Sequence, residues 1–329
     1  MTITRREVLV GATAAAALPL SNTNFAHAAA PPANKQAPSF YRYKVGDIEV
    51  AVVSDGANTF PLADKFILNA SKDEVNAALG KAFLPQDKVT IHFAPLAINT
   101  GGKLVVIDTG NGPAANVASK GAVGQFANNL KAAGIDPNNV DVVVISHFHP
   151  DHVNGLLTSE NLPAFPNAEI LVPATEFKFW MDDGEMSRAP AGRMTDLFKN
   201  NRRVFETALQ KKVTPYEWDK EVVPGLLPVG TVGHTPGHTS FILSSGSERV
   251  FIQSDVTNYP ALFVNNPGWH ANFDQDGAVA ESTRRRVYDM LVAERLKVQG
   301  FHFPFPAIGN VEKDGTGYRL VPAPWSPTI

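Results

Sequence analysis

The 329-residue sequence contains no cysteine, which excludes a disulfide framework, a thiolate metal site and a cysteine nucleophile. Positive charge is also scarce, because 29 Lys and Arg stand against 32 Asp and Glu and the formal net charge is −3. The longest basic run is the arginine triplet at 284–286, which lies in a helical pattern and is best explained as a solvated helix face. This composition indicates a globular protein without a nucleic-acid partner.

Long apolar runs are rare, and the one at residues 8–20 is too short to span a bilayer as a mature helix. It follows Arg5 and Arg6 and precedes Ala-His-Ala at 26–28, an order that is typical of an export signal. We predict a signal peptide at residues 1–28, of the twin-arginine type, with a Sec signal as the alternative. A linker rich in proline and alanine should follow at 29–39, and the mature protein should be periplasmic, with no membrane insertion.

Beyond the linker, strand and helix patterns alternate and predict one domain at residues 40–329. The elements that matter most below are strands at 40–45 and 48–54, an irregular insertion at 57–70, one strand over 90–99, a helix over 276–298 and a strand at 301–305. The stretch 258–274 predicts a long aromatic loop, and loops of that length commonly carry function. Periodicity alone therefore predicts only a mixed α/β protein.

The stretch 146–152 places three histidines and an aspartate directly after a buried, β-branched strand pattern. His147 and His149 are two residues apart, so both can point the same way in an extended turn. Asp151 and His152 are adjacent, so they point elsewhere. One pair can hold one metal ion and the other pair a second ion nearby. A polar loop that happens to be rich in histidine is the alternative, and further His-bearing motifs downstream disfavour it.

This stretch resembles the His-x-His-x-Asp-His motif of the metallo-β-lactamase superfamily. Four other stretches, one before it and three after it, resemble further motifs of that family and follow one another along the chain in the family's order. They are Asp-Thr-Gly at 108–110, Gly-His-Thr-Pro-Gly-His-Thr at 233–239, Gln-Ser-Asp at 253–255 and Gly-Phe-His at 300–302. The resemblance covers nearly all of the chain after the leader. It implies an α/β (α+β) fold, a four-layer αββα sandwich of two pseudo-repeats with metals at the shared edge.

The resemblance also implies a ligand set for two divalent metal ions, with zinc expected and iron, manganese or cobalt as alternatives. The ligands are His147, His149 and His234 for one ion, Asp151, His152 and His302 for the other, and Asp255 between them. Asp151 and Asp255 are expected to take part in catalysis. Asp108 and His238 match positions outside the ligand set, where we expect them to orient ligands by hydrogen bonds.

A hydroxide shared by two metal ions is the nucleophile that the resemblance implies. Redox chemistry is disfavoured, because flavodiiron relatives carry an acidic ligand where this chain has His149. The most similar branch is that of the methyl parathion hydrolase-like enzymes, which includes aryl-lactone hydrolases and phosphotriesterases. We predict an aryl-lactonase, of the dihydrocoumarin hydrolase kind, with phosphotriesterase side activity. The alternatives are an organophosphate hydrolase, an N-acyl homoserine lactone lactonase and a non-catalytic metal-binding protein.

Aromatic residues in two insertions and the long loop predict an apolar wall beside the metals, suited to a small neutral ester, lactone or phosphotriester. The predicted pocket residues are Phe66, Lys72, Trp180, Phe198, Asn258, Trp269 and Phe273. Burial in the core is the alternative for each aromatic residue. Asn258 stands where the superfamily's quorum-quenching lactonases carry a tyrosine, so a tyrosine-assisted ring opening does not carry over. The sequence leaves a homodimer open.

Overall fold

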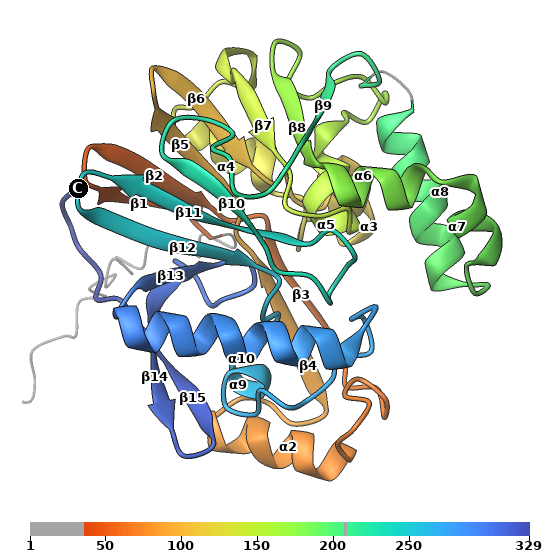
Figure 1. Cartoon of the computed structure of the whole chain (residues 1–329), viewed down its shortest axis with the longest axis vertical. Helices are drawn as coiled ribbons and strands as arrows, with labels where there is room; N and C mark the ends of the chain where they lie inside the picture. Colours follow the sequence, from red (N-terminus) through yellow and green to blue (C-terminus); the bar gives the residue numbers. More distant parts are fainter. Residues whose placement is uncertain (1–35, 207–208) are drawn as a thin grey trace, which may run out of the picture. The chain divides into compact units, whose positions relative to one another are not determined.

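Two β-sheets packed face to face form the centre of the fold, with helices on both outer faces (Figure 1). The computed structural model describes residues 36–206 and 209–329, and the stretch Pro38–Ile329 forms one compact unit. The predicted signal peptide at 1–28 and most of the predicted linker lie outside the described residues. Within the described ranges, no helix has both the length and the apolarity needed to cross a bilayer.

The first sheet has the strand order β1-β2-β5-β6-β7-β8-β9. Its strands are β1 (Phe40–Val45), β2 (Ile48–Val53), β5 (Leu96–Thr100), β6 (Lys103–Ile107), β7 (Val142–Val144), β8 (Glu169–Pro173) and β9 (Val213–Tyr216). The strands from β6 to β9 pair in parallel, whereas the others pair antiparallel. β7 is Val-Val-Val and fully buried, as a parallel strand covered on both faces requires.

The second sheet has the order β10-β11-β12-β13-β14-β15. Its strands are β10 (Leu226–Gly230), β11 (Thr239–Ser245), β12 (Glu248–Ser254), β13 (Lys297–Gly300), β14 (Ile308–Asp314) and β15 (Gly317–Pro322). Only β12 and β13 pair in parallel among these described strands. Val50 and Val105 of the first sheet join Phe241 and Phe251 of the second in one buried cluster, which is the core between the sheets.

The outer faces are covered by amphipathic helices, which confirms the predicted αββα sandwich (Figure 1). The helices are α2 (Lys72–Lys81), α3 (Gly112–Ala118), α4 (Phe126–Ala132), α5 (Pro150–Val153), α6 (Ala174–Met181), α7 (Asp183–Arg188), α8 (Arg193–Phe205), α9 (Pro260–Phe263) and α10 (Gly277–Glu294), with 3-10 turns at Pro137–Asn139 and Asn154–Leu156. α4, α6 and α8 pack on the first sheet, and α10 packs on the second through Val287 and Leu291.

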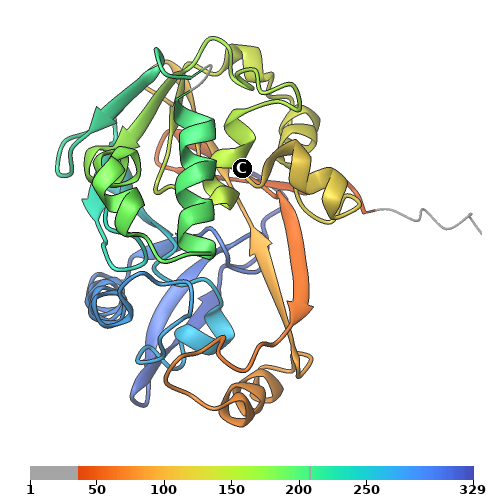
Figure 2. The same ribbon diagram turned by 90° about the vertical axis from the view of Figure 1, so that its right-hand side faces the viewer.

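A two-stranded ribbon of β3 (Gly56–Pro61) and β4 (Lys88–Phe93) runs from the sandwich toward α2 (Figure 2). Phe66, Leu79 and Phe263 join it in a separate buried cluster. The prediction of an irregular segment at 57–70 is therefore wrong for β3. The single strand predicted over 90–99 is also wrong: Pro95 has no N–H to donate, and the chain passes there from β4 in the ribbon to β5 in the first sheet.

Near the C-terminus, the predicted bounds of one helix and one strand are wrong. The helix predicted over 276–298 ends at Glu294, because Arg295 adopts the left-handed conformation (φ 51°) that closes helices, and β13 begins two residues later. The strand predicted at 301–305 is a loop. Pro304 and Pro306 lack the N–H groups that a strand would need there, and the ladder to β14 is made by Val298 and Gln299 instead.

Candidate metal centre

The seven histidines and aspartates expected as metal ligands meet at one edge of the sandwich, where strands end. His147 and His149 lie on the loop that follows β7, and Asp151 and His152 lie on α5 directly after it. His234 lies on the loop between β10 and β11. Asp255 directly follows β12, and His302 lies two residues after β13. Because parallel strands present their carboxyl ends at the same edge, β7, β12 and β13 bring side chains together that are up to 155 positions apart.

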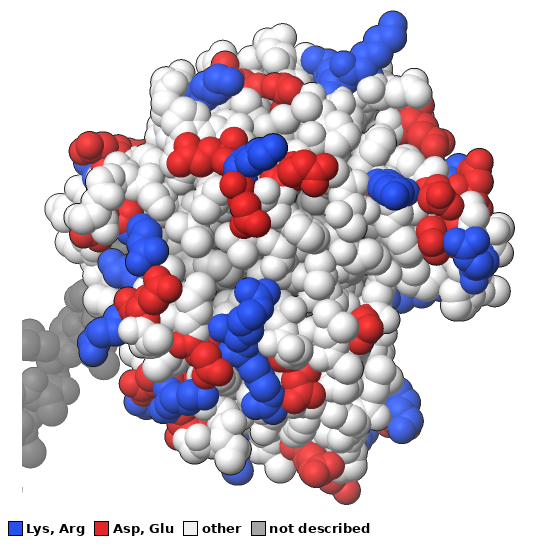
Figure 3. Space-filling model, viewed as in Figure 1, with Lys and Arg blue, Asp and Glu red and all other residues white. Residues whose placement is uncertain are grey.

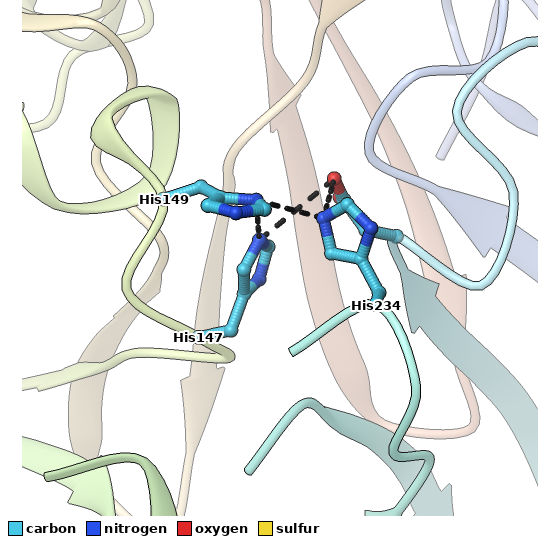
Figure 4. A group of neighbouring side chains, drawn as sticks. His147, His149 and His234 are labelled. Atoms are coloured by element: carbon cyan, nitrogen blue, oxygen red, sulfur yellow. Dashed lines mark hydrogen bonds and ion pairs between the residues drawn. The ribbon is translucent and has the colours of Figure 1, made fainter. Parts of the chain in front are cut away.

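The first group of donors consists of His147, His149, His234 and Asp255, whose ligand atoms all lie within 4.8 Å of one another. Figure 4 shows the three imidazoles converging from two loops on a common point. Nδ1 of His149 lies 3.1 Å from Nε2 of His147 and 2.8 Å from Nε2 of His234. Oδ2 of Asp255 lies 3.2 Å from Nε2 of His234. These nitrogen atoms are close together and their side chains are buried. A cation bound between them would explain this arrangement.

The second group consists of Asp151, His152, Asp255 and His302. Nε2 of His302 lies 3.0 Å from Oδ2 of Asp255, and Nε2 of His152 lies 3.2 Å from its Oδ1. Oδ2 of Asp151 lies 3.4 Å from His152 and 3.5 Å from His302. Asp255 belongs to both groups, with one carboxylate oxygen toward His152 and the other toward His234 and His302, so it can bridge two ions.

Unsatisfied buried atoms test whether these residues fit metal ions. Nε2 of His152 and Oδ1 of Asp255 are both buried and make no hydrogen bond within the described structure. Buried polar atoms without partners are costly, and native proteins nearly always satisfy them. The cluster of five imidazoles and two carboxylates around these atoms fits two divalent cations bound through nitrogen and oxygen.

The electrostatics of the site differ from one imidazole to the next: the pKa is lowered at His147 and His149 and raised at His152 and His234, which face the carboxylates. Burial lowers the pKa of His147 and His149 well below the usual value for histidine, with their neighbouring imidazoles adding to the effect. Burial opposes the charge of Asp255, yet His302 and His152 hold its pKa well below the usual range. Burial also opposes a charge on His234, but hydrogen bonds with Asp255 and Asp274 raise its pKa to about 9. Such carboxylate-rich surroundings attract cations.

Most of the ligand imidazoles make a hydrogen bond at Nδ1, which orients the ring and leaves Nε2 free to bind a metal ion. Oδ2 of Asp108 lies 2.8 Å from Nδ1 of His152, so Asp108 can orient this ring. Nδ1 of His302 donates to the carbonyl oxygen of His92 at 2.7 Å. His238 acts differently: its Nε2 accepts the backbone N–H of Asp255 at 3.0 Å and thereby fixes the bridging residue.

A cavity of about 910 Å³ opens in front of the donor groups. Its apolar side is formed by Phe60, Ala63, Phe66, Ile91, Phe93 and Phe273, and its polar side includes Asn111, Asn154, Arg193, Asn200 and Asn272. Of the predicted pocket residues, Phe66, Asn258 and Phe273 line this cavity. The rings of Phe66 and Phe273 meet edge to face at 5.7 Å, and Nδ2 of Asn258 donates to Oδ2 of Asp255 at 2.7 Å.

Four predicted pocket residues lie elsewhere. Trp180 and Phe198 are fully buried in the core between α6, α8 and the first sheet, with ring centroids 4.7 Å apart, because the apolar faces of both helices turn toward the sheet. Lys72 lies outside the cavity lining and pairs with Asp64 and Asp87 at the surface. Trp269 is half-buried against the cluster around the β3–β4 ribbon and does not line the cavity either.

Two buried carboxylates near the site escaped the sequence analysis. Asp274 lies behind His234, with Oδ1 2.7 Å from Nδ1. Glu176 on α6 is fully buried and accepts the backbone N–H groups of Phe148 and Gly237, which lie on the two loops that carry His147, His149 and His234. A glutamate within the apolar pattern of α6 was the available signal for Glu176. Asp274 gave none, because it ends a loop of polar and aromatic residues.

Comparison with known families and structures agrees with this geometry. A profile of the metallo-beta-lactamase superfamily matches residues 96–293. An N-acyl homoserine lactonase of Bacillus thuringiensis is 28% identical over 172 residues, which are 52% of this chain and 59% of that protein. An N-acyl homoserine lactonase of a Bacillus species is 26% identical over 171 residues, with the same coverage. This chain thus covers less than two-thirds of the length of these relatives.

Two solved structures share the fold over most of this chain. One is AidC, a dizinc quorum-quenching lactonase in complex with its product N-hexanoyl-L-homoserine, with a TM-score of 0.81, 23% identity and coverage of 87% of this chain and 98% of that one. The other is the hydrolase AbOPH in the beta lactamase superfamily, with a TM-score of 0.80, 25% identity and coverage of 89% and 100%. Both likenesses extend well beyond the matched family profile.

Proposed function

Because the chain belongs to the metallo-β-lactamase superfamily, we propose that it is a dinuclear metal-dependent hydrolase that opens lactones and related esters. The observation that carries this proposal is the double donor group, in which two clusters of histidine and aspartate share Asp255 and face one cavity. The dizinc lactonase with the same fold supports zinc as the metal. His147, His149 and His234 would hold one ion, and Asp151, His152 and His302 the other.

Two divalent cations, when bound, supply Lewis acidity and lower the pKa of water toward neutrality. The protein's own residues do the rest. Asp255 spans both groups and fixes their separation, and its position is in turn held by Asn258 at one carboxylate oxygen and by His238 at the backbone N–H. Asp151 is the most exposed of the ligand carboxylates, with 20% of its side chain accessible, so its Oδ2 can accept a proton from the attacking water and return it to the leaving alcohol.

The cavity sets the class of substrate. Phe60, Phe66, Phe93 and Phe273 form an apolar wall that suits an uncharged molecule with a flat ring or an acyl chain. We propose neutral lactones as the main substrates, with aryl lactones of the dihydrocoumarin kind first and phosphotriesters as a side reaction of the same centre. N-acyl homoserine lactones are the second candidate, supported by the relatives and by the amide side chains on the polar side of the cavity.

Rates on one zinc-loaded preparation test this proposal. We expect kcat/KM for dihydrocoumarin or an N-acyl homoserine lactone to exceed that for an aryl dimethyl phosphorothioate by a hundredfold, roughly 2.7 kcal/mol of transition-state preference. The Asp255→Asn variant, which keeps the shape of the bridging side chain, should lose turnover while its circular dichroism spectrum is retained. A reversed preference would assign the protein to organophosphate hydrolysis. Absence of turnover on all three substrates would remove the substrate proposal.

We also propose that residues 1–28 direct export and that the mature enzyme works in the periplasm. The support is the order of arginine pair, apolar stretch and Ala-His-Ala in the sequence. Fractionation of a bacterial host that expresses the full chain, with N-terminal sequencing of the product, tests this proposal. A periplasmic product that begins near residue 29 is expected, and an uncleaved cytoplasmic product would overturn it.

A further inference from the structure

The aspartate behind His234 is joined to a buried arginine. Oδ1 of Asp274 lies 2.7 Å from Nδ1 of His234, and its Oδ2 lies 3.5 Å from Nη2 of Arg284 on α10. The side chains of Asp274 and Arg284 are 1% and 2% exposed, so this is an ion pair within the protein interior. A carboxylate at Nδ1 fixes the imidazole in the tautomer that has its lone pair at Nε2, on the metal side.

Arg284 also holds the long loop that precedes α10. Its Nε donates to the carbonyl of Val256 at 3.0 Å, and its Nη1 donates to the carbonyls of Pro267 and Trp269 at 2.8 and 3.0 Å. Val256 directly follows the bridging Asp255. A buried guanidinium is costly unless it is hydrogen-bonded and paired, and here three carbonyls accept its hydrogen bonds while the Asp274 carboxylate faces Nη2 as an ion pair. The loop is therefore folded around this single cation.

The same loop carries part of the cavity wall. Phe273 lines the cavity and packs edge to face on His234, with ring centroids 6.0 Å apart. Immediately after it, the backbone N–H groups of Gln275 and Asp276 donate to the carbonyls of His234 and Gly233 at 3.1 and 2.9 Å. The segment 273–276 thus contacts the substrate space, the ligand ring and the ligand's own backbone within four residues.

We propose that Asp274 and Arg284 are positioning residues that couple the cavity wall at Phe273 to the metal ligand His234, so that both are held as one unit. Asp274 orients the imidazole, and Arg284 pairs with Asp274 while it anchors the loop on both sides. A change that loosens this pair should weaken one metal position and leave the other, which is built on Asp151, His152 and His302, intact. The inference rests on the proposed metal centre.

Zinc competition with a chromophoric chelator, together with the visible spectrum of the cobalt-substituted protein, tests the coupling. Asp274→Asn keeps the shape of the side chain and removes its charge, and Asp274→Ser avoids placing an amide beside Arg284 should the first variant fail to fold. For either variant we expect one of the two zinc ions to bind about ten- to a hundredfold more weakly, which is the usual effect of removing a residue that orients a ligand. The cobalt absorption should change in the same variant.

The chain offers a matched control on the same helix. Nε2 of His270 pairs with Oε2 of Glu281 at 2.9 Å, which is another histidine–carboxylate contact between this loop and α10, but it is partly exposed and faces no donor group. Glu281→Gln should bind both zinc ions as the wild type does. Wild-type zinc affinities and an unchanged cobalt spectrum in both Asp274 variants would overturn the coupling. A wild-type protein that binds no zinc would instead overturn the metal centre itself.

Discussion

The carboxylate of Asp108 contacts both the ring of His152 and the turn that leads into the donor loop. Its Oδ2 lies 2.8 Å from Nδ1 of His152, and it accepts the backbone N–H and the hydroxyl of Ser146 at 2.9 and 2.8 Å. One side chain therefore sets the start of the loop 146–152 and the orientation of a ligand on it. Asp108 itself has a positive φ of 59°, which aspartate and asparagine tolerate better than most residues.

Asp108→Asn is accordingly the cleanest variant at this position, because it retains the backbone conformation. The amide replaces one acceptor by a donor, so either His152 or Ser146 loses its partner. We expect zinc affinity and kcat to fall about ten- to a hundredfold, with little change in KM. Metal analysis after dialysis and steady-state rates on a lactone measure both effects. An unchanged zinc content would show that His152 needs no support from Asp108.

Glu176 joins the two loops that carry the first three histidines. Oε1 accepts from the N–H of Phe148 at 3.0 Å and from Nε1 of Trp180 at 2.7 Å, and Oε2 accepts from the N–H of Gly237 at 2.7 Å. In Glu176→Gln an amide N–H would face a backbone N–H inside the core. We expect the free energy of unfolding to fall by about 1–3 kcal/mol.

Urea unfolding of the Glu176→Gln variant measures this loss. Glu185→Gln is the control, because Glu185 lies on the exposed helix α7 and pairs with Arg188 at the surface. That change should stay within about 0.5 kcal/mol of the wild type. Equal stability of both variants would mean that the bridge between the loops is dispensable.

His238 should make stability depend on pH. Its Nδ1 donates to the carbonyl of Thr231 at 2.9 Å and its Nε2 accepts from the N–H of Asp255, so it must be neutral. Burial, with the neighbouring His234, lowers its pKa from 6.5 to about 3. In this pH range the His238 side chain binds a proton in the unfolded chain but not in the folded protein. The free energy of unfolding therefore decreases as the pH falls from about 6.5 toward 3.

His238→Gln removes this titration. The variant should be less stable than the wild type at pH 7, and the difference between them should narrow as the pH falls through that interval. Unfolding of the metal-free proteins in urea at several pH values measures the difference. A gap that stays constant from pH 7 to pH 4 would contradict a depressed pKa at His238.

Phe273 should influence the choice between lactone and phosphotriester. Its ring lies beside His234 and Phe66 in the cavity, where it crowds the two alkyl groups of a dialkyl phosphate more than a flat bicyclic ester. Phe273→Leu should therefore raise the ratio of phosphotriesterase to lactonase kcat/KM by about tenfold, or roughly 1.4 kcal/mol. If that ratio stays the same, the steric argument for a lactone preference is wrong.

The ligand residues could be predicted from the sequence because short motifs at strand ends carry them, and those motifs resemble the ones of the metallo-β-lactamase superfamily. The residues that support them could be predicted only in part, because Asp108 and His238 lie within such motifs and Asp274 and Glu176 do not. Asp274 lies 40 positions from His234, and Glu176 lies 61 positions from Gly237, so only the packed fold brings them together. Trp180 and Phe198 were misplaced for a related reason: a helical pattern shows which face is apolar but not whether sheet or cavity receives it.

The even distribution of surface charge could be expected from the composition alone. On the face shown in Figure 3, basic and acidic side chains of the described residues are interspersed rather than gathered by sign. This agrees with the small net charge and with the proposal of an uncharged substrate.

The most direct test of a dinuclear hydrolase is a titration of zinc into the metal-free protein while lactone hydrolysis is followed. The two donor groups around Asp255 predict negligible turnover without metal and a rate that rises until two equivalents of zinc are bound. Full activity in the metal-free protein, or a rate that is complete at one equivalent, would contradict the dinuclear centre.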